Sequence, residues 1–125
     1  MLTEVLGINA KGDLVGSYLD SADVVHGFVL SGGLFTRIDF PGAGHTAAYG
    51  INNRGQIVGR YVMSSNFFAS SAQHSFVLSN GSFANVDPPG TTGRSLASSI
   101  NNSGQIIGLF RDASGRHAYT ASPTD

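Results

Sequence analysis

Three histidines recur at one position of a repeated pattern, and they are the side chains best suited to metal or acid–base chemistry. They are His26, His74 and His117, and the runs that follow the first two end in Asp39 and Asp87. One metal ion would need such side chains to converge, with zinc–nitrogen distances of about 2.0–2.1 Å. Because equivalent positions of successive repeats belong to different sheets, we expect each histidine to contact a nearby carboxylate or loop backbone. We therefore predict structural roles for these residues, and neither a metal site nor a cofactor.

Other patterns that would indicate an enzyme are weak. Asp39 and Asp87 are repeat equivalents followed by proline-containing turns, which favours loop anchoring over paired acid–base catalysis. Glu4 is the only glutamate, cysteine is absent, and no G-x-S-x-G nucleophile motif is present. The segment 112–116 lacks the ligand number of an EF-hand. We therefore do not expect an enzyme.

The elements that must position these side chains are three copies of a nine-residue motif. The copies are INAKGDLVG (8–16), INNRGQIVG (51–59) and INNSGQIIG (100–108). The second and third copies are farther apart than the first and second, because SSNFFASSAQ (64–73) extends one connection. Landmarks that recur in the same order at a spacing of 43 to 49 residues indicate a repeat protein.

The asparagines and glycines of the motif are typical of hairpin turns. Asparagine can close a turn on its own backbone, and glycine adopts positive φ without a steric penalty. We therefore assign structural roles to Asn52, Gly55, Asn101 and Gly104 rather than roles in ligand binding.

Each repeat contains short apolar runs typical of half-buried strands. The runs of the middle copy are 46–51, 56–62, 74–78 and 82–87. Those of the first are 3–8, 13–19, 26–30 and 34–39, and those of the third are 95–100, 105–110 and 117–121. The third and fourth runs are joined by tight turns at 31–33 and 79–81. The sequence thus predicts eleven strands and almost no helix.

Four antiparallel strands in such a repeat match the size of a β-propeller blade. We predict a single all-β, propeller-like repeat domain over residues 1–125, with about 2.75 blades. The blades span about 3–39, 46–87 and 95–122, and the last lacks its outer strand. Because a propeller ring usually needs at least four blades, the chain is either part of a larger ring or closes one by self-association. We expect a homo-oligomer, with two chains in one ring as the simplest closure. A sandwich, barrel or solenoid built from the same hairpins is the alternative.

The ordered elements GINNRGQIVGRY, HSFVL, FANVD and PPG resemble those of the HAF-type bacterial repeat proteins. The family pattern is roughly G-I-N-x-x-G-x-I-V-G-x-Y, then H-x-F, then I-D-x-P-G. This chain departs from it at Ala10, Asp13 and Ser99. The resemblance implies a propeller-like repeat protein that is extracellular or at the cell surface, and it supplies no catalytic residue.

The composition argues against several partners. Only 12% of the residues are charged, the formal net charge is −1, and the arginines are scattered along the sequence. A nucleic-acid-binding protein usually carries a basic patch or stripe. No apolar run approaches the roughly 20 residues of a membrane span, and no signal peptide is visible. We therefore expect neither nucleic acid as a partner nor a membrane span.

The connections opposite the asparagine turns form the predicted ligand-binding face. Phe67 and Phe68 lie among polar residues, where large apolar side chains suit either a stacking platform or a subunit contact. His45 and Arg94 belong to other connections of this face. We therefore predict a non-enzymatic binding module for a glycan or another surface ligand, with these four residues as candidate contacts. A purely structural, self-assembling module is the alternative, and a hydrolase is favoured less.

Overall fold

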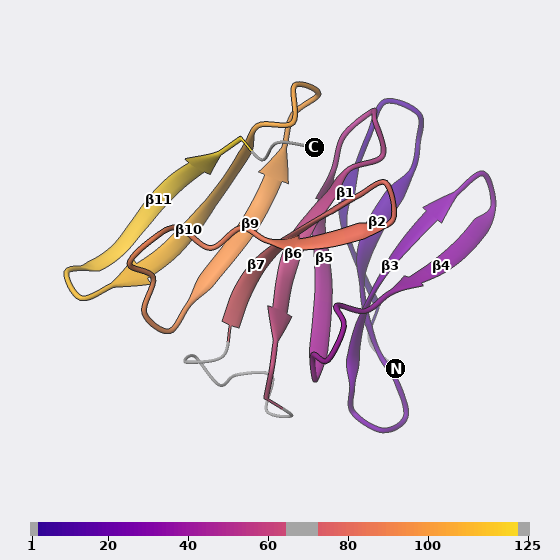
Figure 1. Cartoon of the computed structure of the whole chain (residues 1–125). Coiled ribbons are helices and arrows are strands. Elements are labelled where there is room, and N and C mark those ends of the chain that lie inside the picture. Colours follow the sequence, from indigo (N-terminus) through magenta and orange to yellow (C-terminus); the bar gives the residue numbers. More distant parts are fainter. Residues whose placement is uncertain (1–2, 65–72, 123–125) are drawn as a thin grey trace.

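The computed structural model describes residues 3–64 and 73–122, and all the regular elements within these ranges are strands (Figure 1). The first sheet contains β1 (Thr3–Ile8), β2 (Leu14–Leu19), β3 (Val25–Ser31) and β4 (Leu34–Ile38). The second contains β5 (His45–Ile51), β6 (Ile57–Val62), β7 (Gln73–Ser79) and β8 (Ser82–Asn85). The third contains β9 (Ser95–Ile100), β10 (Ile106–Asp112) and β11 (Gly115–Ala121). These bounds follow the predicted runs closely.

Each sheet is an antiparallel meander in which every strand pairs with the next one along the chain. The prediction of an all-β chain with antiparallel sheets is confirmed. The described strands form three open sheets rather than a closed barrel. Figure 1 shows the sheets in sequence order, with the second between the other two.

The sheets pack face to face through the first strand of each following sheet. β5 contacts β1, β2 and β3, and β9 contacts β5, β6 and β7. The core between the first two sheets contains Val15, Ala48 and Phe76, and Phe40 stacks on the Tyr61 ring beside them. The core between the second and third sheets contains residues that repeat this pattern, including Val58, Ala97 and Ile106. Each apolar core therefore lies between two repeats rather than within one.

The turns have the backbone that their sequences predict. β3 and β4 are joined by Gly32 and Gly33, and β7 and β8 by Asn80 and Gly81. All four residues have positive φ, between 52° and 81°. Two consecutive residues of this kind characterise a type I′ turn, whose twist matches that of a hairpin.

The last glycine of the nine-residue motif allows a close approach of two strands. A Cβ atom on Gly59 would collide with the carbonyl oxygen of Ala47 in the first strand of the same sheet. Gly16 and Gly108 stand in the same relation to Glu4 and Leu96. Each approach lies beside a register shift in the ladder between the first two strands. The glycine is therefore required by packing rather than by its φ angle.

Candidate functional site

The first asparagine of each motif holds its own turn together. Oδ1 of Asn52 accepts hydrogen bonds from the backbone N–H groups of Arg54, at 3.1 Å, and Gln56, at 2.9 Å. Its Nδ2 donates to Oε1 of Gln56 at 2.7 Å. Asn9 and Asn101 make the corresponding bonds in the first and third repeats. The asparagine side chain therefore holds the two ends of a five-residue turn together.

The same asparagines also connect one repeat to the next. Nδ2 of Asn9 donates to the carbonyl of Asn52 at 3.0 Å, and Nδ2 of Asn52 donates to that of Asn101 at 2.8 Å. The second asparagine adds a bond that runs in the same direction, because the N–H of Ala10 donates to Oδ1 of Asn53 at 2.8 Å. The N–H of Asn53 likewise donates to Oδ1 of Asn102 at 2.8 Å. We call this series of bonds between repeats the asparagine ladder.

The three repeated histidines lie in three different sheets, and each contacts a nearby aspartate. Nδ1 of His26 lies 2.6 Å from Oδ1 of Asp39, and its Nε2 lies 2.7 Å from Oδ2 of Asp20. Nδ1 of His74 lies 2.7 Å from Oδ2 of Asp87. His117 lies 2.9 Å from Asp112. Within residues 3–64 and 73–122, no group of three or more acidic, histidine or cysteine side chains is arranged to hold a metal ion.

The most enclosed of these contacts is electrostatically biased toward a charged pair. Burial opposes protonation of His26, but the hydrogen bonds to Asp39 and Asp20 outweigh it and raise its pKa above the ordinary value. Hydrogen bonds from the Val24 N–H and from His26 lower the pKa of Asp20. A protonated imidazole can donate to both carboxylates at once. This arrangement fastens the β2–β3 loop to the end of β4.

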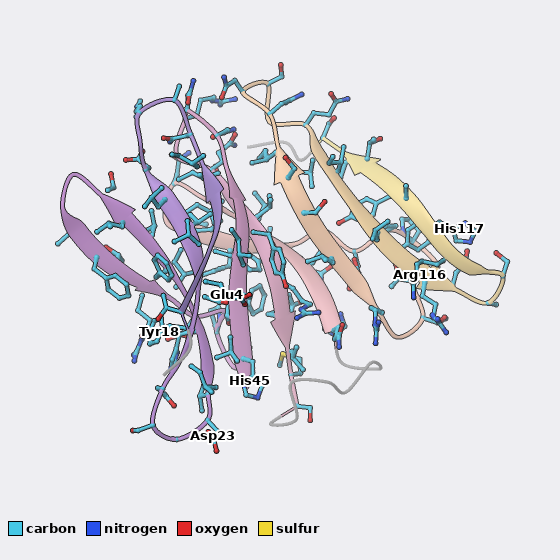
Figure 2. The ribbon with its side chains drawn as sticks, turned by 180° about the vertical axis from the view of Figure 1, so that it is seen from behind. Glu4, Tyr18, Asp23, His45, Arg116 and His117 are labelled. Carbon is cyan, nitrogen blue, oxygen red and sulfur yellow. The ribbon has the colours of Figure 1, made fainter. Side chains whose placement is uncertain are left out.

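The predicted ligand contacts have different surroundings in the structure. His45 is buried at the start of β5, and its Nδ1 accepts a hydrogen bond from the backbone N–H of Val25 in the first sheet, at 3.0 Å. Figure 2 shows it far from His117 and Arg116 of the third sheet. His45 therefore links the first two sheets. Phe67 and Phe68 lie outside the described residues.

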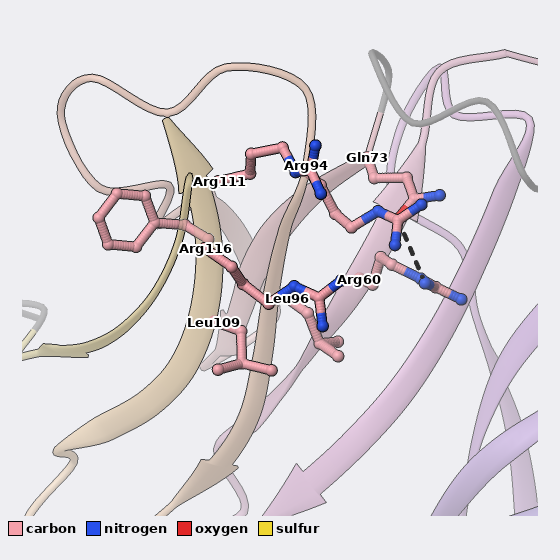
Figure 3. Close-up of a pocket in the computed structure, with 8 residues that line it drawn as sticks. Arg60, Gln73, Arg94, Leu96, Leu109, Arg111 and Arg116 are labelled. Carbon is pink, nitrogen blue, oxygen red and sulfur yellow. Dashed lines mark hydrogen bonds between the residues drawn. The ribbon is translucent and has the colours of Figure 1, made fainter. Parts of the chain in front are cut away.

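Arg94 lines a cleft together with three other arginines. The cleft has a volume of about 140 Å³ and lies between the second and third sheets. It is lined by Arg60, Arg94, Arg111 and Arg116, together with Gln73, Leu96, Leu109 and Phe110 (Figure 3). We call it the arginine cleft. It gathers four of the six arginines of the chain, which the sequence spreads over 57 positions.

Strand pairing brings these arginines together. Arg111 on β10 is directly opposite Arg116 on β11. The N–H of Arg111 donates to the carbonyl of Arg94 at 2.9 Å, just before β9 begins. Arg60 extends from β6, where its Nη1 donates to Oε1 of Gln73 at 3.3 Å and its guanidinium lies 5.9 Å from the centre of the Tyr49 ring. The lining contains no carboxylate.

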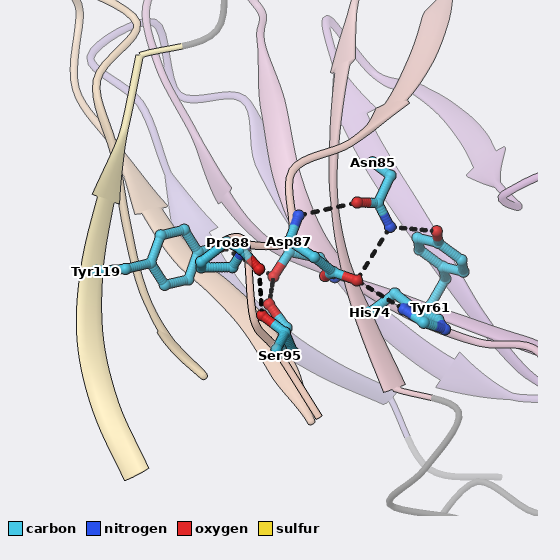
Figure 4. A network of polar contacts seen from close by, with 9 residues as sticks. Tyr61, His74, Asn85, Asp87, Pro88, Ser95 and Tyr119 are labelled. Carbon is cyan, nitrogen blue, oxygen red and sulfur yellow. Dashed lines mark hydrogen bonds and ion pairs between the residues drawn. The ribbon is translucent and has the colours of Figure 1, made fainter. Parts of the chain in front are cut away.

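A second polar network extends across the second sheet to the third, and most of its groups are hydrogen-bonded to one another (Figure 4). Nδ2 of Asn85 donates to the Tyr61 hydroxyl at 2.7 Å, and the Tyr119 hydroxyl donates to Oγ of Ser75 at 2.9 Å. Ser75 in turn contacts Ser95 of the third sheet. Burial raises the pKa of both tyrosines, which therefore act as hydrogen-bonding groups rather than as bases near neutral pH.

The fold and these sites define a class of protein, namely an all-β protein made of three repeated antiparallel sheets joined by an asparagine ladder. Comparison with protein-family models, with curated proteins and with solved structures gives no match. In the described part of the chain, no helix has the length and apolar character needed to cross a membrane.

Proposed function

We propose that this protein is a non-enzymatic repeat module that completes its array by docking a second copy onto its end faces. One observation carries the proposal. Val15, Val58 and Ile107 occupy the eighth position of the three motifs. Val15 and Val58 have 0% exposure because the next sheet covers them, whereas Ile107 in the last sheet is 52% exposed.

The opposite end of the array repeats this contrast. Ile8, Ile51 and Ile100 occupy the first position of the motifs. Ile51 and Ile100 are each 7% exposed because they pack against the preceding sheet, whereas Ile8 in the first sheet is 65% exposed. The chain thus has two exposed faces at the ends of the array. One corresponds to the surface that the following sheet covers inside the chain, and the other to the surface that the preceding sheet covers.

We call these surfaces the N-terminal face (Val5, Ile8 and Phe35) and the C-terminal face (Ile107 and Leu109). All five side chains are at least 46% exposed. Burying one large apolar side chain contributes about 1.5–3 kcal/mol. Because these five are only about half exposed, their further burial would supply about 4–8 kcal/mol, in the lower part of the roughly 4–15 kcal/mol lost when two molecules associate. We therefore expect an association that depends on concentration, reinforced if a closed ring forms two junctions at once.

The asparagine ladder supports the same arrangement. Asn52 donates its Nδ2 to the carbonyl of the following repeat, and Asn101 has no following repeat within the described chain. A second copy would present the carbonyl of its Asn9 at this position. It would also present Ala10, which cannot accept the second bond that Asn53 and Asn102 accept inside the chain. A junction between copies would therefore retain one of the two ladder bonds.

Two such copies would supply six sheets, a number typical of a closed β-propeller. We propose this propeller-like ring as the complete fold, and membership of the HAF-type repeat proteins as its family. The ordered landmarks of the sequence support the family assignment, because each motif forms a turn and each repeated histidine lies near the start of a third strand. We also propose an extracellular or cell-surface location, which rests on that resemblance.

Analytical ultracentrifugation over a wide concentration range tests the proposal with two matched variants. Ile8→Asp removes the N-terminal face and Ile107→Asp the C-terminal face, so each variant alone should stay monomeric. Mixed together, they should form a dimer with a single junction, because each supplies the face that the other lacks. Ala113→Asp, in an exposed turn away from both faces, is the control and should associate as the unmodified chain does. A monomeric unmodified chain at every concentration, or a mixture without dimers, would overturn the proposal.

A further inference from the structure

We propose that the arginine cleft is a binding site for an oxyanion, a carboxylate, sulfate or phosphate group carried by a ligand that also has an apolar part. The observations that carry it are separate from those that support the docking of a second copy. It rests on the charge, the geometry and the size of the cleft.

The charge of the cleft is unbalanced, although that of the whole chain is not. The formal net charge of the protein is −1, but four guanidinium groups line this one cleft and no carboxylate does. Asp112, near the end of β10, is held by His117 and Ser114. Within the described residues, the side chains of Arg94, Arg111 and Arg116 form no hydrogen bond or ion pair. Like charges gathered in this way repel one another, and a bound anion would relieve the repulsion.

The backbone fixes the positions from which these side chains extend. Arg111 and Arg116 form a cross-strand pair, and the carbonyl of Arg94 accepts the N–H of Arg111. Figure 3 shows the arginines extending into the cleft from both sheets. The planar guanidinium donates parallel hydrogen bonds that match the oxygens of a carboxylate, sulfate or phosphate group. Several such groups around one cleft can therefore hold an oxyanion from more than one side.

The apolar part of the lining indicates what else the ligand carries. Leu96 on β9 lies opposite Leu109 on β10, and Phe110 is adjacent to this pair. These side chains provide an apolar surface beside the charges. The cleft, at about 140 Å³, is smaller than the roughly 300–1,000 Å³ of sites that enclose a drug-sized molecule. It therefore has room for an anionic group and one small ring or short chain, so we infer an acidic sugar, the C–H groups of whose ring would be its apolar part, or a compound of similar size.

The binding experiment is best performed in the Ile8→Asp background. Leu109 belongs both to the cleft and to the C-terminal face, so a docked copy would complicate the titration. Ile8→Asp removes association while leaving the third sheet unchanged. If the chain proves monomeric without this change, the unmodified protein serves equally well, and anion binding is measured separately from docking.

Backbone amide shifts of the isotope-labelled protein are titrated with phosphate, sulfate and glucuronate, and with glucose as the neutral counterpart. We expect saturable shifts near Arg94 and Arg111 with at least one anion and none with glucose. The anion that binds identifies the preferred oxyanion. Arg94→Gln and Arg116→Gln should each weaken binding at least about tenfold, since each removes a charged hydrogen-bond donor. Arg94→Lys should keep part of the affinity that Arg94→Gln loses, because lysine retains the charge without the planar pair of donors.

Arg37→Gln is the matched control. Arg37 forms an ion pair with Asp39 at 2.9 Å in the first sheet, so its removal changes the net charge equally but leaves the cleft intact. Thermal unfolding of each variant checks that it is folded. The proposal is wrong if no anion gives saturable shifts at millimolar concentrations. It is also wrong if Arg37→Gln weakens binding as much as the cleft variants do, since binding would then reflect overall charge alone.

Discussion

Replacing Asn52 by alanine tests the asparagine ladder most directly. Asn52 is buried, and its side chain donates two hydrogen bonds, to Gln56 and Asn101, and accepts two, from Arg54 and Gln56. The carbonyl of Asn101 keeps its bond from the N–H of Gly104, but the backbone N–H and side-chain oxygen of buried Gln56 lose these partners. Leaving a buried polar group unsatisfied costs about 1–3 kcal/mol. We therefore expect Asn52→Ala to lower the free energy of unfolding by about 3 kcal/mol.

The matched variant is Asn101→Ala. Asn101 braces its own turn in the same way, but it is exposed and makes no ladder bond to a following repeat in the described chain. Water can replace its partners, so its loss should cost only about 1 kcal/mol. Urea unfolding followed by circular dichroism, in the Ile8→Asp background, measures both values without a contribution from association. Equal costs for the two asparagines would show that the turn alone matters, and the ladder reasoning would fail.

Three further substitutions test the local arguments. The pKa of His26 is raised in the folded state, so its stabilisation should be fully present below about pH 6.5 and be lost as the pH rises through the folded value. His26→Asn should abolish this pH dependence of the unfolding free energy. The contribution that is lost should be less than about 1 kcal/mol, because the Asp39 side chain is 40% exposed and solvent screens the interaction. An unchanged pH profile would contradict the assignment. Gly59→Ala should cost about 3 kcal/mol or more, because its Cβ meets a backbone carbonyl, whereas Gly55→Ala should cost about 1–2 kcal/mol for its φ of 79°. Urea unfolding that gives equal costs would refute the steric argument.

The secondary structure could be predicted because the sequence repeats its local signals. Each strand has its own apolar pattern and each turn its own glycine or asparagine, and both act over a few residues. Strand ends therefore agree within one or two residues for most runs, as in 95–100 against Ser95–Ile100. The way in which whole sheets pack depends on contacts between repeats that are far apart in the chain. The sequence shows that the repeats exist, but it does not show which of their faces meet.

The arginine cleft illustrates what sequence reasoning missed. Arg60 and Arg116 are far apart in the chain, and neither lies in a basic cluster. They meet because β6 belongs to the second sheet and β11 to the third, which packs on it. The sequence does give one signal, because Arg94 in the third repeat occupies the position of His45 in the second, and both belong to the predicted ligand-binding face. The surroundings differ, however: His45 is covered by the preceding sheet, whereas Arg94 is exposed.

The asparagine ladder also gives the array a direction, which limits how copies can meet. Every bond between side-chain amide and carbonyl runs from one repeat to the following one, as from Asn9 to Asn52 and from Asn52 to Asn101. Two C-terminal faces brought together would each offer the amide of Asn101 and lack the matching carbonyl. Head-to-tail contact is the arrangement that continues the ladder, and such contacts form a ring if the rotation between sheets closes and a filament if it does not. Because Ala10 removes one ladder bond at each junction between copies, that junction should be the weakest in the array and the first to open.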